Sequence, residues 1–191
     1  MAQRAVTDQS SLTDYRSLSE LVAEHQPTSP REVGAKARFL SELARLDDPC
    51  NEEADPVHVT ASALVVGPRG TVLHRHKRLG IWLQPGGHID PGEAAPVAAR
   101  REAMEELGLA VEHPAEGPHL IHLDVHEAAL GHTHLDLRYL LLAADAEADP
   151  APPPGESPEA RWYGWEEAAA VADPGLAGAL PVARAAWEAL T

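Results

Sequence analysis

Three glutamates near the middle of the chain have types and spacing suited to binding a cation. Glu102, Glu105 and Glu106 lie in a segment that is predicted to form one helix, from about Ala95 to Leu107, ended by Gly108. At about 100° per residue, Glu105 falls about 60° to one side of Glu102 and Glu106 about 40° to the other. The three carboxylates therefore share one face of the helix. The opposite side is expected to pack against a sheet through its apolar residues Val97, Ala103, Met104 and Leu107.

Such an acidic face is unfavourable by itself. Like charges three and four residues apart each cost about 0.2–0.5 kcal/mol, and acids in the last turns face the negative end of the helix dipole. Two interpretations are open. One is a solvated acidic face in an acidic protein. The other is a hard cation, Mg²⁺ or Mn²⁺, held by oxygen ligands with open positions for water and phosphate.

The segment before the helix favours a ligand site. Gly86 and Gly87 follow Pro85 and form a predicted loop whose backbone a ligand can approach without interference from side chains. Glu93 stands at the helix entrance, where a carboxylate can cap free N–H groups or reach back into the site. Arg101 lies beside the glutamates and is placed to hold one carboxylate.

The run from Gly87 to Leu109 resembles the Nudix box of the Nudix hydrolase family. That pattern is a Gly, five residues, a Glu, seven residues, then Arg-Glu-aliphatic-any-Glu-Glu-any-Gly-aliphatic. The chain matches it in register with Gly87, Glu93, Arg101, Glu102, Glu105, Glu106, Gly108 and Leu109. One departure is Ala103, where a larger aliphatic residue is usual, and this affects packing more than chemistry.

The resemblance implies an α/β (α+β) fold, an α/β/α sandwich with a mixed sheet. It also implies hydrolysis of a nucleoside diphosphate linked to another moiety, giving a nucleoside monophosphate and a phosphorylated product. Mg²⁺, with Mn²⁺ as the alternative, would be held by Gly86 (through its carbonyl), Glu102, Glu105 and Glu106. Glu93 and Arg101 are implied as supporting residues of the catalytic site. Spacing does not decide which glutamate is the general base, and Glu105 is preferred to Glu102.

Residues outside the box are candidates for contact with this small-molecule substrate. A basic island just before the loop can reach phosphate oxygens, although a solvated strand end is the alternative. The strand after the box runs beside the site in the Nudix family, and His88 lies in the box loop, where a local hydrogen bond is an equal alternative. The candidates are Arg75, Lys77, Arg78, His88, His134, Asp136 and Arg138.

Eleven histidines raise the question of zinc. Strand alternation places His122, Asp124 and His126 on one face of a strand, and His132 and His134 on one face of another. Two histidines on one strand can bind a metal, but the sequence assures no third ligand and offers no thiolate cluster. Zinc is therefore not expected.

The amino-acid composition limits the classes of binding partner that this protein can have. The chain has 191 residues with 30 acidic and 15 basic side chains, a formal charge of −15, which argues against nucleic-acid polymers and anionic membranes as partners. The single cysteine, Cys50, excludes a disulfide framework. Neither an apolar run of the roughly 20 residues needed to span a membrane nor an apolar signal segment is found, so a cytoplasmic location is expected.

The elements divide into two parts. Residues 1–55 are predicted to form a helical extension, and residues 56–191 the Nudix domain. The first helix has an apolar stripe of Leu12, Tyr15, Leu18, Leu21 and Val22. The second begins after Ser29-Pro30 and has a stripe of Val33, Ala37, Leu40, Leu43 and Ala44. This pair is expected to pack against the sandwich or to form part of a homodimer interface.

The second part is predicted to consist of strands with only a few helices, which favours an α+β or mixed-sheet domain, and a Pro-rich loop covers residues 149–158. Trp82 is expected in the core, and the aromatic residues near 162–165 are expected to anchor the final strand. The predicted strands are Val57–Val66, Thr71–Arg75, Ile81–Leu83, His119–Val125, Leu135–Ala144 and Arg161–Trp165. The predicted C-terminal helices are Glu166–Val171 and Leu176–Leu190.

Two other functions are compatible with parts of this pattern. A sensor on the Nudix fold would bind a nucleotide without cleaving it, but such proteins often lose a box glutamate or add a basic helix pair. Here the glutamates are intact and the N-terminal helices are not basic. A purely structural acidic protein would show no dependence on a metal.

Overall fold

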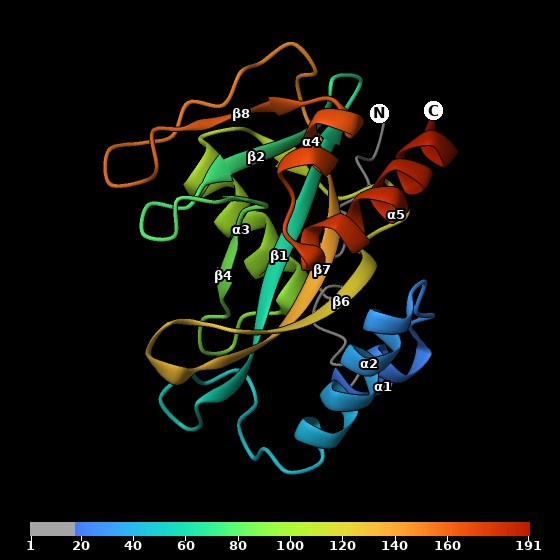
Figure 1. Ribbon diagram of the computed structural model, residues 1–191, viewed down its shortest axis with the longest axis vertical. Coiled ribbons are helices and arrows are strands. Elements are labelled where there is room, and N and C mark those ends of the chain that lie inside the picture. Colours follow the sequence, from blue (N-terminus) through green and yellow to red (C-terminus); the bar gives the residue numbers. More distant parts are fainter. Residues whose placement is uncertain (1–17) are drawn as a thin grey trace, which may run out of the picture.

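One mixed sheet forms the centre of the protein (Figure 1). The structure is a computed structural model and describes residues 18–191. The strand order is β3-β2-β1-β7-β5, while β4 also pairs with β1, β6 with β7 and β8 with β2. The strands are β1 (Val57–Gly67), β2 (Gly70–Arg75), β3 (Trp82–Leu83), β4 (Gly86–His88), β5 (Val111–Glu112), β6 (His119–Glu127), β7 (Thr133–Ala143) and β8 (Ala160–Tyr163).

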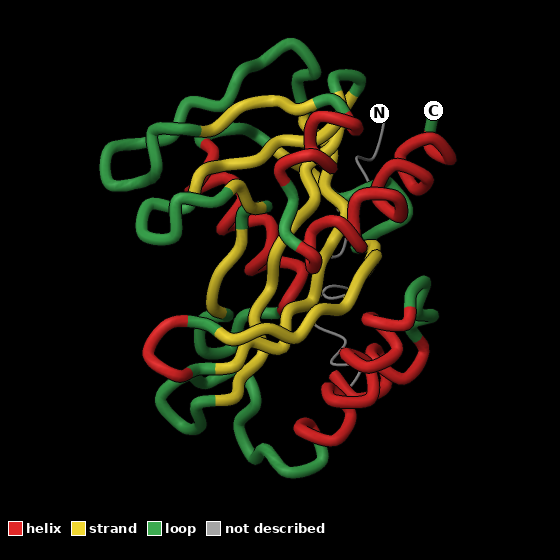
Figure 2. The backbone as a smooth tube through the Cα atoms, in the orientation of Figure 1, coloured by secondary structure: helices red, strands yellow, loops and turns green. Residues whose placement is uncertain are grey.

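Helices cover both faces of this sheet (Figures 1 and 2). They are α1 (Leu18–Glu24), α2 (Pro30–Leu43), α3 (Ala95–Leu107), α4 (Trp165–Val171) and α5 (Pro174–Leu190). On one face α3 packs against β1 and β4. On the other, α5 contacts β1, β6 and β7, and α4 contacts β2. The predicted α/β/α sandwich with a mixed sheet is confirmed.

Strand β1 is buried on both faces, because α3 packs on one face of the sheet and α5 on the other. Within the sheet it lies between β7, to which it is parallel, and the antiparallel strands β2 and β4. This position explains its nearly continuous apolar sequence. Val59, Ala61 and Ala63 belong to the apolar cluster that includes α3, whereas Leu64 and Val66 pack with α5. The first half of the α5 face is polar instead, and its side chains from β1 are His58, Thr60 and Ser62.

The N-terminal helices share the main apolar core. As predicted, Ser29 caps α2, and its hydroxyl accepts a hydrogen bond from the backbone N–H of Glu32 at 3.2 Å. Val22 and Phe39 are fully buried in the cluster that contains α3. The predicted stripe of α2 is partly wrong, since Val33 is 57% exposed. The large Phe39 ring buries more apolar area than Val33 would, so it decides which side of the helix faces the sheet.

Three further points bear on the sequence predictions. Leu12 and Tyr15 of the first predicted helix lie outside the described residues. The division between residues 55 and 56 and the role of the helical pair in a homodimer stay predictions. Trp82, from the short strand β3, packs against the apolar cluster under α5, as expected for a core residue.

The segment Gly86–His88, predicted as a loop, is strand β4 and pairs with Thr60–Ser62 of β1. A Cβ atom on Gly86 would collide with Ser62, so the close approach of the two strands requires glycine there. Among residues 18–191, no helix has the length and apolar character needed to cross a bilayer.

Candidate active site

Helix α3 presents the three glutamates, and alanines hold it close to the sheet. Gly108 ends the helix in the left-handed conformation, with φ of 59°, as predicted. The buried residues of α3 are Ala95, Ala98, Ala99, Ala103 and Leu107. The prediction that Val97 and Met104 pack against the sheet is wrong, because they are 42% and 38% exposed. A stripe of alanines lets the helix backbone lie close to β1, and the longer side chains stay outside this contact.

Two of the glutamates lie against the backbone of β4. The N–H of Gly86 donates to Oε2 of Glu106 at 2.9 Å. The carboxylate of Glu102 lies over Gly87, where an added Cβ would stand 2.7 Å from Glu102 Cδ. The side chain of Glu105 is 58% exposed, against 18% for each of the other two. The fold therefore places Glu102 and Glu106 at the glycines of β4 and leaves Glu105 toward solvent.

Arg101 connects the parts of the box. Its Nη1 donates to Glu102 Oε1 at 2.6 Å and to Glu105 Oε2 at 3.2 Å. Its Nε and Nη2 donate to the two oxygens of Glu93 at 3.0 and 2.8 Å, and Nη2 also donates to the backbone oxygen of His88 at 2.9 Å. A planar guanidinium with several donors suits this fork, which fixes α3 to the segment before it.

Burial opposes ionisation of two of the glutamates. It raises the pKa of Glu106 to about 7, although the hydrogen bond from Gly86 acts in the other direction. Burial also raises the pKa of Glu102, against the effect of Arg101. For Glu93, burial again disfavours the charge, but hydrogen bonds from Arg101 and a backbone N–H lower its pKa overall. The positive charge that the chain places near Glu102 and Glu106 is therefore too small to offset the effect of burial on their pKa.

This arrangement fits a hard divalent cation. The donors of Glu102, Glu105 and Glu106 are all oxygens, which suit Mg²⁺ or Mn²⁺. A cation between them would favour the ionised carboxylates that burial disfavours. The carbonyl of Gly86 as a fourth protein ligand stays a prediction, while the N–H of the same residue already orients Glu106.

A Gly87→Ala variant is expected to fold normally but to need about 10–100-fold more Mg²⁺ for half-maximal activity. The three atoms nearest to the new methyl group would belong to the flexible end of Glu102, so the carboxylate would swing out of place while the backbone remains. Mg²⁺ titrations of activity measure the effect. Gly34→Ala is the matched control, because an added Cβ there meets nothing within 4 Å. An unchanged Mg²⁺ requirement in Gly87→Ala would contradict this placement of Glu102.

A cavity of about 300 Å³ opens beside Glu106. Its lining residues are His74, His76, Lys77, Arg78, Glu106, Glu156 and Ser157. Two members of the predicted basic island, Lys77 and Arg78, thus share a cavity with a box glutamate. The third, Arg75, points elsewhere, because its Nε donates to the backbone oxygen of Gly80 at 3.0 Å and its Nη1 pairs with Glu159 at 3.2 Å. Contact of all three with substrate stays a prediction.

Four residues of this cavity, His74, His76, Glu156 and Ser157, were missed from the sequence. His74 is 5% exposed, and its Nε2 lies 3.7 Å from Glu106 Oε2. Burial lowers the pKa of His74 to about 4, so the ring is neutral at neutral pH. Strand alternation in β2 was a signal that could have found it. Glu156 and Ser157 come from the Pro-rich loop, and only the tertiary fold brings that loop beside β2, where Ser157 donates to the backbone oxygen of Arg75 at 2.6 Å.

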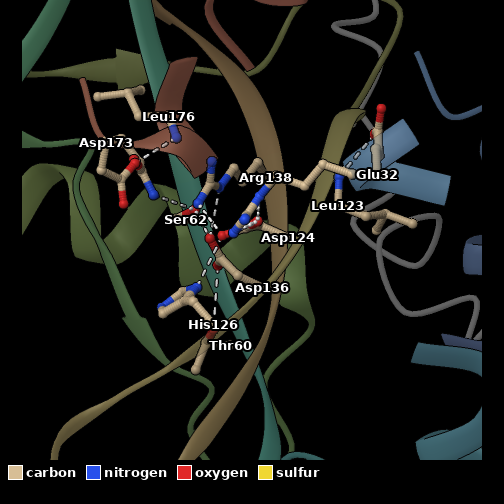
Figure 3. Close-up of polar contacts among 12 residues, drawn as sticks. Glu32, Thr60, Ser62, Leu123, Asp124, His126, Asp136, Arg138, Asp173 and Leu176 are labelled. Carbon is tan, nitrogen blue, oxygen red and sulfur yellow. Dashed lines mark hydrogen bonds and ion pairs between the residues drawn. The ribbon is translucent and has the colours of Figure 1, made fainter. Parts of the chain in front are cut away.

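Asp136 and Arg138 lie in a buried polar network on the α5 face of the sheet (Figure 3). They are 3% and 2% exposed. Arg138 Nε donates to Asp136 Oδ2 at 2.9 Å, and Nη2 donates to Asp124 Oδ2 at 3.0 Å. The hydroxyl of Ser62 donates to Asp136 at 2.7 Å. In this structure both charges are held by neighbouring side chains, and their contact with substrate stays a prediction.

His88 and His134 are half-buried on the same polar face, their ring centroids 5.4 Å apart. Each also lies close to the ring of His58, which is fully buried. The structure therefore brings together two of the predicted substrate contacts, at the end of β4 rather than in the cavity of Lys77 and Arg78.

The fold and the carboxylate site define a class: an α/β/α protein with a loop-and-helix site suited to a divalent cation. The model of the NUDIX domain matches residues 56–184. The chain therefore belongs to the NUDIX family. Its domain is that of a Nudix pyrophosphohydrolase.

Several proteins are similar to this chain. A NUDIX-family hydrolase from Clostridium perfringens is 29% identical, with a TM-score of 0.57, and the match covers 70% of this chain and 98% of that one. An Ap4A hydrolase of C. elegans, 22% identical with a TM-score of 0.56 over 69% and 97% of the two chains, shows the shared fold. The "Putative 8-oxo-dGTP diphosphatase" of Bacillus subtilis (strain 168) is 49% identical over 37 residues, which are 19% of this chain and 25% of that protein. The chain thus matches about a quarter of the length of this curated relative.

Proposed function

We propose that this protein uses Mg²⁺ to hydrolyse a pyrophosphate bond in a nucleoside diphosphate linked to another moiety, releasing a nucleoside monophosphate and a phosphorylated product. The observation that carries the proposal is the placement of Glu102 and Glu106 against β4, with Arg101 joining Glu102 and Glu105 to Glu93 at the helix entrance. This is an oxygen-donor site beside a cavity with basic side chains, which matches the needs of phosphate chemistry.

Each part of the site has a distinct role in this proposal. Glu102, Glu105 and Glu106 would hold Mg²⁺, which when bound neutralises charge on phosphate oxygens and makes a water more acidic. Glu105 is the proposed general base, because it is the most exposed of the three and therefore the most accessible to water. Arg101 keeps Glu102 and Glu105 in place.

The substrate is proposed to lie with its phosphates toward the cavity of Lys77 and Arg78. Their cationic groups attract a polyanion to a protein whose formal charge is −15. Lys77 lies 3.9 Å from Glu156, a contact loose enough for a phosphate to replace. Contact of His88 and His134 with the remainder of the substrate stays a prediction from the sequence.

A substrate panel tests the proposal directly. The full chain is incubated with Mg²⁺ and nucleotide sugars, oxidised nucleoside triphosphates, dinucleoside polyphosphates and non-nucleotide diphosphates, and the products are identified by mass spectrometry. Cleavage between two phosphorus atoms of a nucleotide compound supports the proposal. Binding of these compounds without any product would instead indicate the non-hydrolytic sensor.

Mg²⁺ is expected to raise the melting temperature by about 5–10 °C at a concentration one hundred times the dissociation constant. The gain arises because the cation binds the folded carboxylate site and relieves repulsion among the glutamates. Glu105→Gln should reduce this rise in melting temperature, since it removes one charged ligand and leaves the apolar core unchanged. Thermal unfolding with and without Mg²⁺ measures both. An equal shift in the two proteins would exclude Glu105 as a ligand.

A further inference from the structure

Three histidines from three strands meet on the polar face of the sheet. His58 of β1 stands opposite His134 of β7 in the parallel register. His88 of β4 pairs with Thr60, two residues from His58 and therefore on the same face. The ring centroids are 5.0 Å apart for His58 and His134 and 5.1 Å apart for His58 and His88. These three residues are called the histidine cluster below.

The nitrogens of the histidine cluster converge. One ring nitrogen from each residue lies within 4.8 Å of the other two. Three imidazole ligands on one tetrahedral ion stand about 3.3 Å from each other, from a metal–nitrogen distance of about 2.0–2.1 Å. Small side-chain rotations would therefore close the cluster around an ion, without any movement of the strands.

His58, the central member of the histidine cluster, has one ring nitrogen without a hydrogen-bond partner among the described residues. Nε2 of His58 is buried and has no hydrogen-bond partner among residues 18–191, while Nδ1 lies 3.4 Å from the backbone oxygen of Asp55. A carbonyl at Nδ1 favours the tautomer in which Nε2 keeps a free lone pair, which is how protein carbonyls orient metal-binding histidines. Leaving such a buried polar atom unsatisfied costs about 1–3 kcal/mol.

The other members of the histidine cluster also offer nitrogen donors. Nε2 of His88 is buried without a hydrogen bond, although it stands 3.2 Å from a carboxylate oxygen of Glu52. Burial lowers the pKa of His134 to about 4 and also lowers that of His58, so both rings are neutral at neutral pH. Neutral imidazole is the form that binds metal.

We propose that the histidine cluster binds a transition-metal ion, with Zn²⁺ as the best fit, at a site separate from the carboxylate site. Three imidazole ligands and one remaining position are typical of zinc, whereas Mg²⁺ prefers the all-oxygen donors of α3. Glu52 and His132 form a second group with His58, in which the ligand atoms lie within 4.8 Å of one another. Sequence alone does not predict this site, because the three ligands come from strands that only the sheet brings together.

The proposed ion would tie the box to the sheet. His88 directly follows Gly87, which lies under Glu102, and its backbone oxygen accepts from Arg101. His58 and His134 belong to the central pair of parallel strands. A bound ion would thus join the end of β4 to β1 and β7 and fix the backbone beneath a glutamate of the carboxylate site. The same ion would remove His88 and His134 from contact with substrate.

The test is metal binding by the full chain, freed of metal by a chelator and held in excess Mg²⁺ so that the carboxylates are occupied. Zn²⁺ is titrated by calorimetry, and Co²⁺ is added as a spectroscopic probe, because four-coordinate Co²⁺ absorbs visible light far more strongly than six-coordinate Co²⁺. We expect one Zn²⁺ per chain and a strong visible Co²⁺ band. His134→Gln and His88→Gln should each weaken Zn²⁺ binding at least about 100-fold. Removing a residue that only orients a metal ligand already lowers metal affinity by up to about 100-fold, and removing the ligand itself should lower it at least as much.

His119→Gln is the matched control, because His119 is an exposed residue at the start of β6 and lies outside the cluster. It should bind Zn²⁺ like the unchanged protein. The Mg²⁺-dependent rise in melting temperature shows that each variant is folded, and His134→Gln carries the test if His88→Gln fails to fold. Absence of Zn²⁺ binding in the presence of Mg²⁺, a weak six-coordinate Co²⁺ spectrum, or equal affinity in His134→Gln and His119→Gln would each overturn the proposal. None of these readouts depends on hydrolysis.

Discussion

Glu106→Gln is expected to lose hydrolytic activity, by on the order of 10³-fold or more in kcat/KM, and to keep its fold. The fall follows because a neutral amide no longer supplies a charged ligand, and transition-state stabilisation by the cation is worth several kcal/mol, at about 1.4 kcal/mol for each factor of ten. The fold should survive because burial already favours the neutral form of Glu106 and raises its pKa to about 7. The amide oxygen of Gln can still accept the hydrogen bond from Gly86.

Steady-state rates on the best substrate of the panel, with thermal unfolding in parallel, measure this effect. Glu112→Gln is the matched control: Glu112 is an exposed carboxylate on β5, outside the box, and its loss should leave the rate unchanged. Turnover retained by Glu106→Gln at the level of Glu112→Gln would rule out Glu106 as a metal ligand. Substrate binding retained by Glu106→Gln without turnover would be consistent with the assignment.

Arg138→Met is expected to lower the free energy of unfolding by about 3–5 kcal/mol, the usual cost of removing one partner from a buried ion pair. The Arg138 side chain is 3% exposed and binds Asp124 and Asp136, whose side chains are 2% and 4% exposed. Without it, Asp136 keeps only hydroxyl donors, Ser62 at 2.7 Å and Thr60 at 3.2 Å. The buried carboxylates of Asp124 and Asp136, which are paired across β6 and β7, would then have less positive charge to offset their repulsion (Figure 3).

Denaturant unfolding measures this loss. Arg184→Met is the control, because Arg184 forms only exposed ion pairs with Glu188 and Glu166 and its removal should change stability little. In a double variant, Asp136→Leu should recover part of the loss from Arg138→Met, since an apolar pair leaves no buried charge. A loss in Arg138→Met no larger than in Arg184→Met would show that the network does not hold the sheet together.

The pH dependence of the same variant follows from Asp124. Burial disfavours its charge, but His126, Arg138 and Arg31 outweigh this and lower its pKa from 3.8 to about 2. A lowered carboxyl pKa stabilises the folded state above pH 3.8, and this stabilisation is lost as the pH falls toward 2. Arg138→Met should therefore lose less stability than the unchanged protein over that pH range.

Local sequence was sufficient for the box. Glu102, Glu105 and Glu106 share a face because helical geometry fixes their angles. Gly108 ends the helix because glycine readily adopts the left-handed conformation, whatever the rest of the chain does. The strand Val57–Val66 and the start of the second helix at Ser29-Pro30 were equally readable, since both depend on neighbours within a few residues. The buried side of α3 was not, because alanines, Val97 and Met104 have similar apolar character and only the sheet selects among them.

The sequence by itself determined the family, the carboxylate face and the order of the longer strands and helices, though not β4 and β5, because periodicity and motif spacing are local properties of the chain. Only the tertiary structure decided where the remaining polar residues belong. It placed Lys77 and Arg78 beside Glu106, closed Asp136 and Arg138 into a buried network, and brought His58, His88 and His134 together. The physical reason is that β4 and β7 flank β1 from distant parts of the sequence, so the neighbours of each side chain depend on strand pairing that no local pattern encodes.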